Sequence, residues 1–248
     1  MTMRRALRQM SSGIMDGGVL MARSEGTPQG GPLSPLLANE LLDEVDKELE
    51  RRGHSFVRYA DDANVYVRSR RAGQRAMALL KLYGRLRLKV NEAKSAVASV
   101  FRRKFLGYSF RVAAGGKIKR RVADKAMTAF KARVRKLTRR SGGAGLQQVV
   151  ERLRSYVLGW KAYFGKAETP KVWRELDQWI RHRMRAIQLQ QWRRGTTAYR
   201  ELPARGARPD IAQRVAGNYG CLWRNSGTPL NGVLDLSWAD QLGIPRLF

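Results

Sequence analysis

The chain has 248 residues, and its 49 Lys and Arg residues against 20 Asp and Glu residues give a formal net charge of +29. Its hydrophobic content of 43% indicates a folded protein rather than a disordered basic tail, and no apolar run approaches the ~20 residues of a membrane span. One cysteine excludes a disulfide framework, and with only two histidines it cannot supply a Cys/His zinc module.

The first 112 residues alternate between helical and strand-like patterns. A stretch dense in Gly and Pro, residues 25–35, cannot form a regular helix or a central strand. Ser34 followed by Pro35 predicts the start of a helix, because Ser is a good N-cap and Pro is tolerated in the first turn. Apolar residues then recur on one face, and the helix is expected to end at Gly53.

Two carboxylates, Asp61 and Asp62, lie between short β-type runs at 56–59 and 65–67. This pattern predicts an antiparallel hairpin with both acids at its bend. The remaining elements expected in this part are a helix over 72–86 and a strand pair over 96–101 and 105–112.

Beyond Gly115 and Gly116 the pattern becomes helical and strongly cationic. Between residues 101 and 200 there are 27 basic and 5 acidic residues. Apolar spacing predicts three helices, over 124–140, 146–164 and 170–193. Residues 201–248 show no clear periodicity and are expected to be a basic C-terminal extension without an assigned fold.

The charge is distributed unevenly along the chain. Residues 1–62 hold 8 basic and 10 acidic residues, whereas the remainder holds 41 basic and 10 acidic residues. This asymmetry indicates a carboxylate-bearing part joined to a part that binds nucleic acid. A coding bias toward Arg and a membrane surface are the alternatives, and the bias does not explain the scarcity of acids. A soluble cytoplasmic protein with a polyanionic partner is expected.

Asp61 and Asp62 are the residues that most clearly carry chemistry. Adjacent carboxylates at a tight turn repel each other, so a fold that keeps both ionised usually supplies a cation. Mg²⁺ binds a few carboxylate oxygens and completes its shell with water and substrate phosphates. A two-metal site uses this arrangement to activate a 3′-hydroxyl and to stabilise departing pyrophosphate. An ordinary Asp-Asp hairpin turn is the alternative that the tetrapeptide 59–62 leaves open.

The segment Tyr59-Ala60-Asp61-Asp62 is accompanied by four others in a fixed order. They are Thr27-Pro28-Gln29-Gly30-Gly31-Pro32-Leu33-Ser34-Pro35-Leu36-Leu37-Ala38-Asn39, the segment 86–95 that contains Lys94, Lys104-Phe105-Leu106-Gly107-Tyr108-Ser109-Phe110, and Leu153-Arg154-Ser155-Tyr156-Val157-Leu158-Gly159-Trp160-Lys161-Ala162-Tyr163-Phe164-Gly165. In this order and spacing the five segments closely resemble the reverse transcriptases encoded by bacterial group II introns. The resemblance runs from about residue 8 to at least 195.

The resemblance implies an α+β chain. Residues 1–112 would be a partial reverse-transcriptase palm, a short antiparallel sheet with helices, and residues 113–200 an all-α thumb or maturase domain that binds RNA. The implied activity is RNA-directed DNA polymerisation, with two Mg²⁺ ions held by the catalytic Asp61 and Asp62. The resemblance also gives roles to the residues that contact nucleotide or template, Gln29, Gly30, Gly31, Pro32, Tyr59 and Lys94, and to the primer-gripping residues Phe105, Leu106 and Gly107. A core tyrosine at 59 and a plain surface lysine at 94 are the alternatives.

The match also departs from the family. Members carry fingers and an earlier palm strand that supplies a third catalytic Asp, and we expect this chain to contain neither. The Mg²⁺ site should then be one carboxylate short, as in the C-terminal part of a larger enzyme. The HNH endonuclease of some relatives needs clustered His and Cys, whereas His54, His182 and Cys221 are far apart in sequence. Three other acids are expected on the solvated face of the helix that starts at Ser34: Asp43, Glu44 and Asp46.

The helical part interleaves aromatic residues with cations. The expected RNA-binding residues are Arg154, Lys161, Lys166, Arg174, Arg181, Arg183 and Arg185. The aromatic residues Trp160, Tyr163, Phe164, Trp173 and Trp179 either stack on unpaired bases or form the core of the helices.

The expected function is that of a group II intron reverse transcriptase with a maturase role in splicing. The alternatives are a non-catalytic maturase that binds intron RNA and an inactive remnant. The expected partners are intron RNA, primer and template nucleic acid, and dNTPs, with no membrane. A separate N-terminal reverse-transcriptase fragment or a second copy of the chain would supply the fingers.

Overall fold

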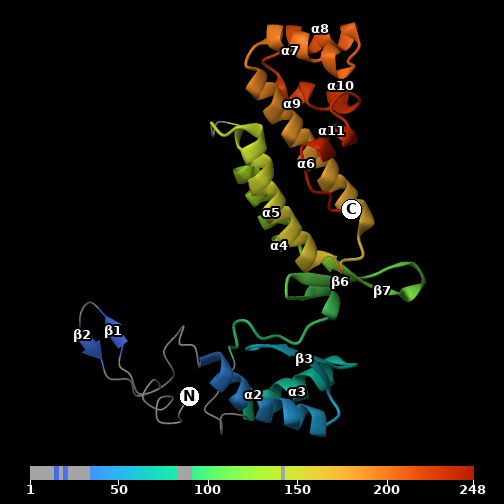
Figure 1. Ribbon diagram of the computed structural model, residues 1–248. Coiled ribbons are helices and arrows are strands. Elements are labelled where there is room, and N and C mark those ends of the chain that lie inside the picture. Colours follow the sequence, from blue (N-terminus) through green and yellow to red (C-terminus); the bar gives the residue numbers. More distant parts are fainter. Residues whose placement is uncertain (1–13, 17–18, 22–33, 83–90, 141–142) are drawn as a thin grey trace. The chain divides into compact units, whose positions relative to one another are not determined.

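The computed structural model describes residues 14–16, 19–21, 34–82, 91–140 and 143–248 (Figure 1). The chain divides into two compact units, Met1–Ser99 and Val100–Phe248. The division lies ahead of the boundary expected at residue 112, because the strands around 104–112 pair within the second unit. No helix in the described ranges is long and apolar enough to cross a membrane.

The first unit is built around a hairpin flanked by two helices. Helix α2 (Ser34–Arg51) leads into the antiparallel strands β3 (Ser55–Tyr59) and β4 (Asp62–Tyr66), and helix α3 (Arg70–Leu82) follows. A second small hairpin pairs β1 (Ile14–Asp16) with β2 (Val19–Met21). The small core of this unit joins α2 to α3 and consists of Val45, Leu49 and Leu79, with Leu42, Phe56, Val65 and Leu80 packed around them. The predicted helix start and the predicted hairpin are confirmed.

The second unit begins with a three-stranded antiparallel sheet in the order β5-β6-β7, preceded by the 3₁₀ turn η2 (Val100–Arg102). The strands are β5 (Lys104–Phe105), β6 (Tyr108–Val112) and β7 (Ile118–Val122), and the 3₁₀ turn η3 (Ala114–Gly116) joins the last two. The expected strand over 96–101 is wrong, because β6 pairs with β5 on one side and with β7 on the other.

Three helices form the body of the second unit: α4 (Asp124–Leu137), α5 (Leu146–Phe164) and α6 (Pro170–Trp192). Their core is fully buried and consists of residues such as Phe130, Leu153, Val157, Ile180 and Met184. All three predicted helices are confirmed, and α5 has the predicted bounds. Together with the hairpins they give the α+β class expected from the sequence.

The residues after α6 form a compact helical layer. Its elements are α7 (Gly195–Glu201), η5 (Pro203–Arg205), α8 (Pro209–Gly217), α9 (Leu222–Asn225), α10 (Thr228–Asn231) and α11 (Leu236–Gln241). A second core, which includes Leu202, Leu230 and Leu234, holds these helices against the end of α6. The expectation of a basic extension is wrong, since residues 201–248 hold five Arg and four acidic residues.

Candidate metal turn and nucleic-acid interface

Asp61 and Asp62 lie at the tip of the β3–β4 hairpin, as predicted. Tyr59 pairs with Asp62 across the hairpin, so only Ala60 and Asp61 form the turn. Ala60 has a φ of 51°, in the left-handed region that L-residues rarely adopt. Both carboxylates are exposed, and Tyr59 is 64% exposed, which excludes its alternative interpretation as a core tyrosine.

The donor set at this turn fits part of a magnesium shell. Two adjacent carboxylates supply the oxygen ligands that Mg²⁺ prefers, and solvent can complete the shell. Among the described residues there is no group of three or more His, Cys, Asp or Glu side chains that could hold a metal ion. Asp61 and Asp62 could therefore hold a divalent cation only together with water, substrate phosphates or ligands from outside the described ranges.

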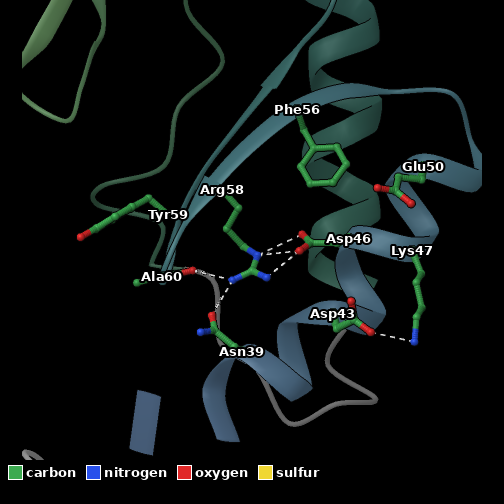
Figure 2. A pocket seen from close by; sticks show the side chains of 9 residues that line it. All are labelled: Asn39, Asp43, Asp46, Lys47, Glu50, Phe56, Arg58, Tyr59 and Ala60. Carbon is green, nitrogen blue, oxygen red and sulfur yellow. Dashed lines mark hydrogen bonds and ion pairs between the residues drawn. The ribbon is translucent and has the colours of Figure 1, made fainter. Parts of the chain in front are cut away.

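The guanidinium of Arg58 holds the turn against helix α2 (Figure 2). Its Nε lies 3.0 and 2.8 Å from the two carboxylate oxygens of Asp46, and its Nη2 donates to Asp46 Oδ2 at 2.6 Å. Its Nη1 donates to Asn39 Oδ1 at 2.9 Å and to the carbonyl oxygen of Ala60 at 3.1 Å. The bond to the Asp46 carboxylate raises the pKa of Arg58 above its ordinary value. Sequence reasoning missed Arg58, whose partner Asp46 lies twelve residues away.

An open hollow of about 760 Å³ lies beside this network. Its lining residues are Asn39, Asp43, Asp46, Lys47, Glu50, Phe56, Arg58, Tyr59 and Ala60. Asp43 forms an exposed ion pair with Lys47 at 2.7 Å, as expected of a solvated helix face, and Glu44 lies near the same lysine. The expectation for Asp46 is wrong, because its side chain is only 19% exposed and is paired with Arg58.

The predicted nucleotide-contacting residues Gln29, Gly30, Gly31 and Pro32 lie outside the described residues. Lys94 is exposed in a turn after Asn91, whose side chain accepts a hydrogen bond from the Lys94 backbone N–H. The described part of the chain therefore leaves their predicted roles untested.

Of the predicted primer-gripping residues, Phe105 ends strand β5, and Leu106 and Gly107 form the tight turn between β5 and β6. Leu106 and Gly107 both have positive φ, at 49° and 76°, as a two-residue hairpin turn of type I′ requires. A Cβ on Gly107 would lie 2.9 Å from Cζ of Phe164 in α5. This turn therefore rests on the last residues of the α5 helix.

A dense group of cations lies on α4 and the residues just after it. We call this surface the α4 cationic face; its members are Lys125, Lys131, Arg133, Arg135, Lys136, Arg139 and Arg140. All but Lys131 are exposed, and none forms an ion pair with another described residue. The one acid of this segment, Asp124, instead pairs with Arg121 of β7. The sequence-based list of RNA-binding residues did not include this face, although its charge run is visible in the sequence.

Several of the cations predicted to bind RNA contact the last six residues of the chain. Arg154 Nη1 donates to the Gly243 carbonyl oxygen at 3.0 Å, and Lys161 Nζ donates to the Arg246 carbonyl oxygen at 3.0 Å. The guanidinium of Arg174 lies over the ring of Phe248. These side chains stay near the surface, but their polar groups already have protein partners.

The same C-terminal residues are anchored by a buried carboxylate. Asp177 is 6% exposed, and its two oxygens accept hydrogen bonds from the backbone N–H groups of Leu247 and Phe248 at 2.8 and 3.1 Å. Burial raises the pKa of Asp177, although both hydrogen bonds oppose the shift. Leu247 is buried in the main core, so residues 243–248 are an integral part of the second unit.

Arg185 is not a surface residue, and its predicted role in RNA binding is corrected. It is 4% exposed and donates to the carbonyl oxygens of Ser226 and Leu234 and to Asn231 Oδ1, at 2.8 to 3.1 Å. Burial lowers the pKa of Arg185 to about 10, so it stays charged at neutral pH. Its role is to fasten α6 to the C-terminal helices.

Arg183 is half-buried. Its Nε donates to Thr138 Oγ1 at 2.6 Å, and its Nη2 donates to the Thr138 carbonyl oxygen at 3.2 Å. Burial lowers the pKa of Arg183, and the charges of Arg135 and Arg140 act in the same direction. The remaining predicted RNA-binding residues are Lys166, which is exposed, and Arg181, which is half-buried.

The aromatic residues divide between the core and the surface. Trp160, Phe164 and Trp173 are buried in the main core. The guanidinium groups of Arg135 and Arg183 both lie over the ring of Trp179, at 5.6 and 5.4 Å from a ring centroid.

Both units contain residues that match known protein families. Residues 6–110 match the family described as reverse transcriptase (RNA-dependent DNA polymerase), and residues 127–206 match the group II intron maturase-specific domain. Protein YkfC of Escherichia coli (strain K12) is 47% identical over 45 residues, which is 18% of this chain. The matched stretch spans only 12% of the length of YkfC.

Proposed function

Because the chain belongs to the group II intron reverse transcriptases and maturases, we propose that it binds folded intron RNA and that the α4 cationic face makes the main phosphate contacts. The observation that carries the proposal is the absence of ion-pair partners for this face among the described residues. Cations without protein counter-charges are available to neutralise RNA phosphates and to release the counterions that RNA holds.

Electrostatic crowding supports this assignment. Burial disfavours the charged form of Arg183, and the nearby charges of Arg135 and Arg140 add to this effect without a described acid that pairs with any of the three. A bound polyanion would relieve this repulsion, since an opposite charge nearby favours the charged state of each guanidinium. By contrast, three of the five Arg residues of 201–248 already pair with acids: Arg205, Arg208 and Arg246.

The proposal is tested by binding to a folded group II intron RNA at fixed salt. Arg133→Gln/Lys136→Gln/Arg140→Gln should weaken binding about 10- to 100-fold, since each substitution removes one phosphate contact. The matched control Arg208→Gln/Arg214→Gln/Arg224→Gln removes the same charge from residues 201–248 and should change binding little. Equal losses in both variants would show that net charge, and not the α4 cationic face, determines affinity.

We further propose that Asp61 and Asp62 are metal ligands for template-directed transfer of dNTPs to a primer 3′-hydroxyl. Mg²⁺, when bound, would supply the positive charge that activates the hydroxyl and stabilises pyrophosphate. A third carboxylate would have to come from outside the described residues, from a separate N-terminal fragment or from a second copy. The exposed position of the turn supports this role, because substrate phosphates and water can reach both carboxylates.

This second function is tested by Mg²⁺-dependent primer extension on an RNA template. Extension by the wild-type chain should vanish in Asp61→Ala/Asp62→Ala, while RNA affinity is unchanged. Asp43→Ala, which removes an exposed carboxylate from α2, is the control and should retain extension. Absence of extension by wild-type protein that binds RNA would leave the non-catalytic maturase as the function of this chain.

Three further assignments are part of the proposal. Residues 1–112 would act as the palm and residues 113–200 as the thumb or maturase domain, as the two family matches support. Gln29, Gly30, Gly31, Pro32, Tyr59 and Lys94 would contact nucleotide or template, and Phe105, Leu106 and Gly107 the primer. The place of action would be the bacterial cytoplasm, where intron RNA is transcribed.

A further inference from the structure

We propose that Arg58 is a positioning residue for the metal turn: by bridging helix α2 and the Ala60 carbonyl, it holds Asp61 and Asp62 in the orientation that receives a divalent cation. This inference rests on the metal-binding role proposed above for the two carboxylates. Figure 2 shows the guanidinium with Asp46 on one side and with Asn39 and Ala60 on the other.

All three nitrogens of the Arg58 guanidinium have acceptors. Nε and Nη2 bind the Asp46 carboxylate in a bidentate arrangement, and Nη1 is shared between Asn39 Oδ1 and the Ala60 carbonyl oxygen. The side chains of Arg58 and Asp46 are only 16% and 19% exposed, so water competes weakly for these bonds. A planar fork of this kind fixes direction as well as distance.

The bond to the Ala60 carbonyl determines the direction of the turn. This oxygen belongs to the same planar peptide unit as the nitrogen of Asp61, so a directional hydrogen bond to the oxygen restrains the orientation of the whole unit. Ala60 has a φ of 51°, a conformation that an L-residue keeps only when its surroundings enforce it. Arg58 supplies that constraint from the residue before Tyr59, on the same strand.

Asp46 neutralises the positive charge that Arg58 brings close to the metal turn. An unpaired guanidinium beside two metal-binding carboxylates would repel Mg²⁺ and lower its affinity. Pairing with Asp46 neutralises the charge of Arg58 while leaving its hydrogen bond to the turn intact. The pair therefore provides orientation without electrostatic competition.

The test uses the full chain and Fe²⁺ in place of Mg²⁺. With ascorbate and peroxide, bound Fe²⁺ generates hydroxyl radicals that cut the nearby backbone, and the fragments are identified by mass. Wild-type protein should be cut beside residues 61–62, and Asp61→Ala/Asp62→Ala should not. Arg58→Lys keeps the positive charge but cannot form the fork, and it should reduce the cutting about 10-fold, the order of loss seen when partners of metal ligands are removed.

One further measurement and two further variants distinguish a positioning role of Arg58 from a role in folding. Amide hydrogen exchange in Arg58→Lys should become faster at residues 59–62 and stay unchanged in α2 and α3. The control variant Arg71→Lys, at an exposed position on α3, should be cut by Fe²⁺ to the same extent as the wild-type protein. If Arg58→Lys unfolds the unit, Asp46→Asn tests the same point, because it leaves the guanidinium charge uncompensated and should also reduce the cutting.

The possible results are distinguishable. Wild-type cutting at 61–62 that Arg58→Lys and Asp46→Asn leave unchanged would overturn the positioning role while keeping the metal role of the turn. Wild-type cutting no stronger than that of Asp61→Ala/Asp62→Ala would overturn the metal role and the positioning role together. Cutting that is lost in Asp61→Ala/Asp62→Ala, reduced in Arg58→Lys and Asp46→Asn, and unchanged in Arg71→Lys supports the inference.

Discussion

Tyr108 and Tyr163 join the β5–β6 turn to the end of helix α5 by hydrogen bonds that run in opposite directions. The hydroxyl of Tyr108 donates to the Tyr163 carbonyl oxygen at 2.6 Å, and the hydroxyl of Tyr163 donates to the Leu106 carbonyl oxygen at 3.1 Å. The primer-gripping turn implied by the resemblance and the helix of the maturase-specific match therefore belong to one folded unit. A substitution at this contact should therefore affect the packing of both the β5–β6 turn and the end of helix α5.

Gly107→Ala should destabilise the second unit by about 2–4 kcal/mol, because its new Cβ meets Phe164 in addition to the strain of a positive φ. Gly115→Ala is the matched control: its φ of 72° is similar, but nothing lies within 4 Å of its Cβ. Gly115→Ala should lower the free energy of unfolding only by the strain of a positive φ, about 1 kcal/mol. Equilibrium denaturation of the two variants measures the difference, and equal losses would contradict the close contact with Phe164.

Arg185→Met should lower the free energy of unfolding by about 2–4 kcal/mol, because it leaves two buried carbonyl acceptors and the part-buried Asn231 Oδ1 without their donor. RNA affinity of the folded protein should not change, since the side chain is buried. Denaturant titration and RNA binding on the same preparation provide the check, with the exposed Arg224→Met as control. Unchanged stability with weakened RNA binding would restore the original prediction for Arg185.

Protonation of the half-buried His182 beside α9 should destabilise the second unit in mild acid. The ring stacks on Trp223, and its Nε2 lies 2.9 Å from the Trp223 carbonyl oxygen. Burial, together with the charges of Arg185 and Arg183, lowers the pKa of His182 below its ordinary value of 6.5. The neutral ring therefore contributes its full stabilisation above pH 6.5, and this contribution is lost as the pH falls through the lowered pKa.

Melting temperatures at pH 7.5 and 5.0 test this prediction. The wild-type melting temperature should fall further over that range than that of His182→Gln, whose amide can bind the carbonyl but takes up no proton. Parallel decreases in the two proteins would exclude a contribution from His182.

The main elements of the fold can be predicted from the sequence where the helical spacing of apolar residues continues over many residues. Helix α5 keeps its period from Leu146 to Phe164, and Pro170 defines the start of α6. Strand β7 was missed because only its two ends, Ile118 and Val122, are apolar and its middle carries three cations. Tertiary pairing with β6 forms this strand, and such pairing leaves no local period in the sequence.

The candidate site is only partly readable. The Asp61–Asp62 pair stands out because its residues are adjacent, whereas Arg58 and Asp46 come from different elements. Charge counting also cannot separate Arg185 from an exposed arginine, since its acceptors lie 41 to 49 residues further along the chain and two of the three are backbone carbonyls. Burial and long-range hydrogen bonds decide the roles of these residues.

The most direct test of RNA binding by the α4 cationic face is the salt dependence of intron RNA affinity. Wild-type affinity should fall linearly on a log–log plot, and Arg133→Gln/Lys136→Gln/Arg140→Gln should reduce that slope by about 2–3, at ~0.7–0.9 per phosphate contact. The control Arg208→Gln/Arg214→Gln/Arg224→Gln should keep the wild-type slope. An α4 variant with the wild-type slope, or a wild-type affinity that does not respond to salt, would contradict the account.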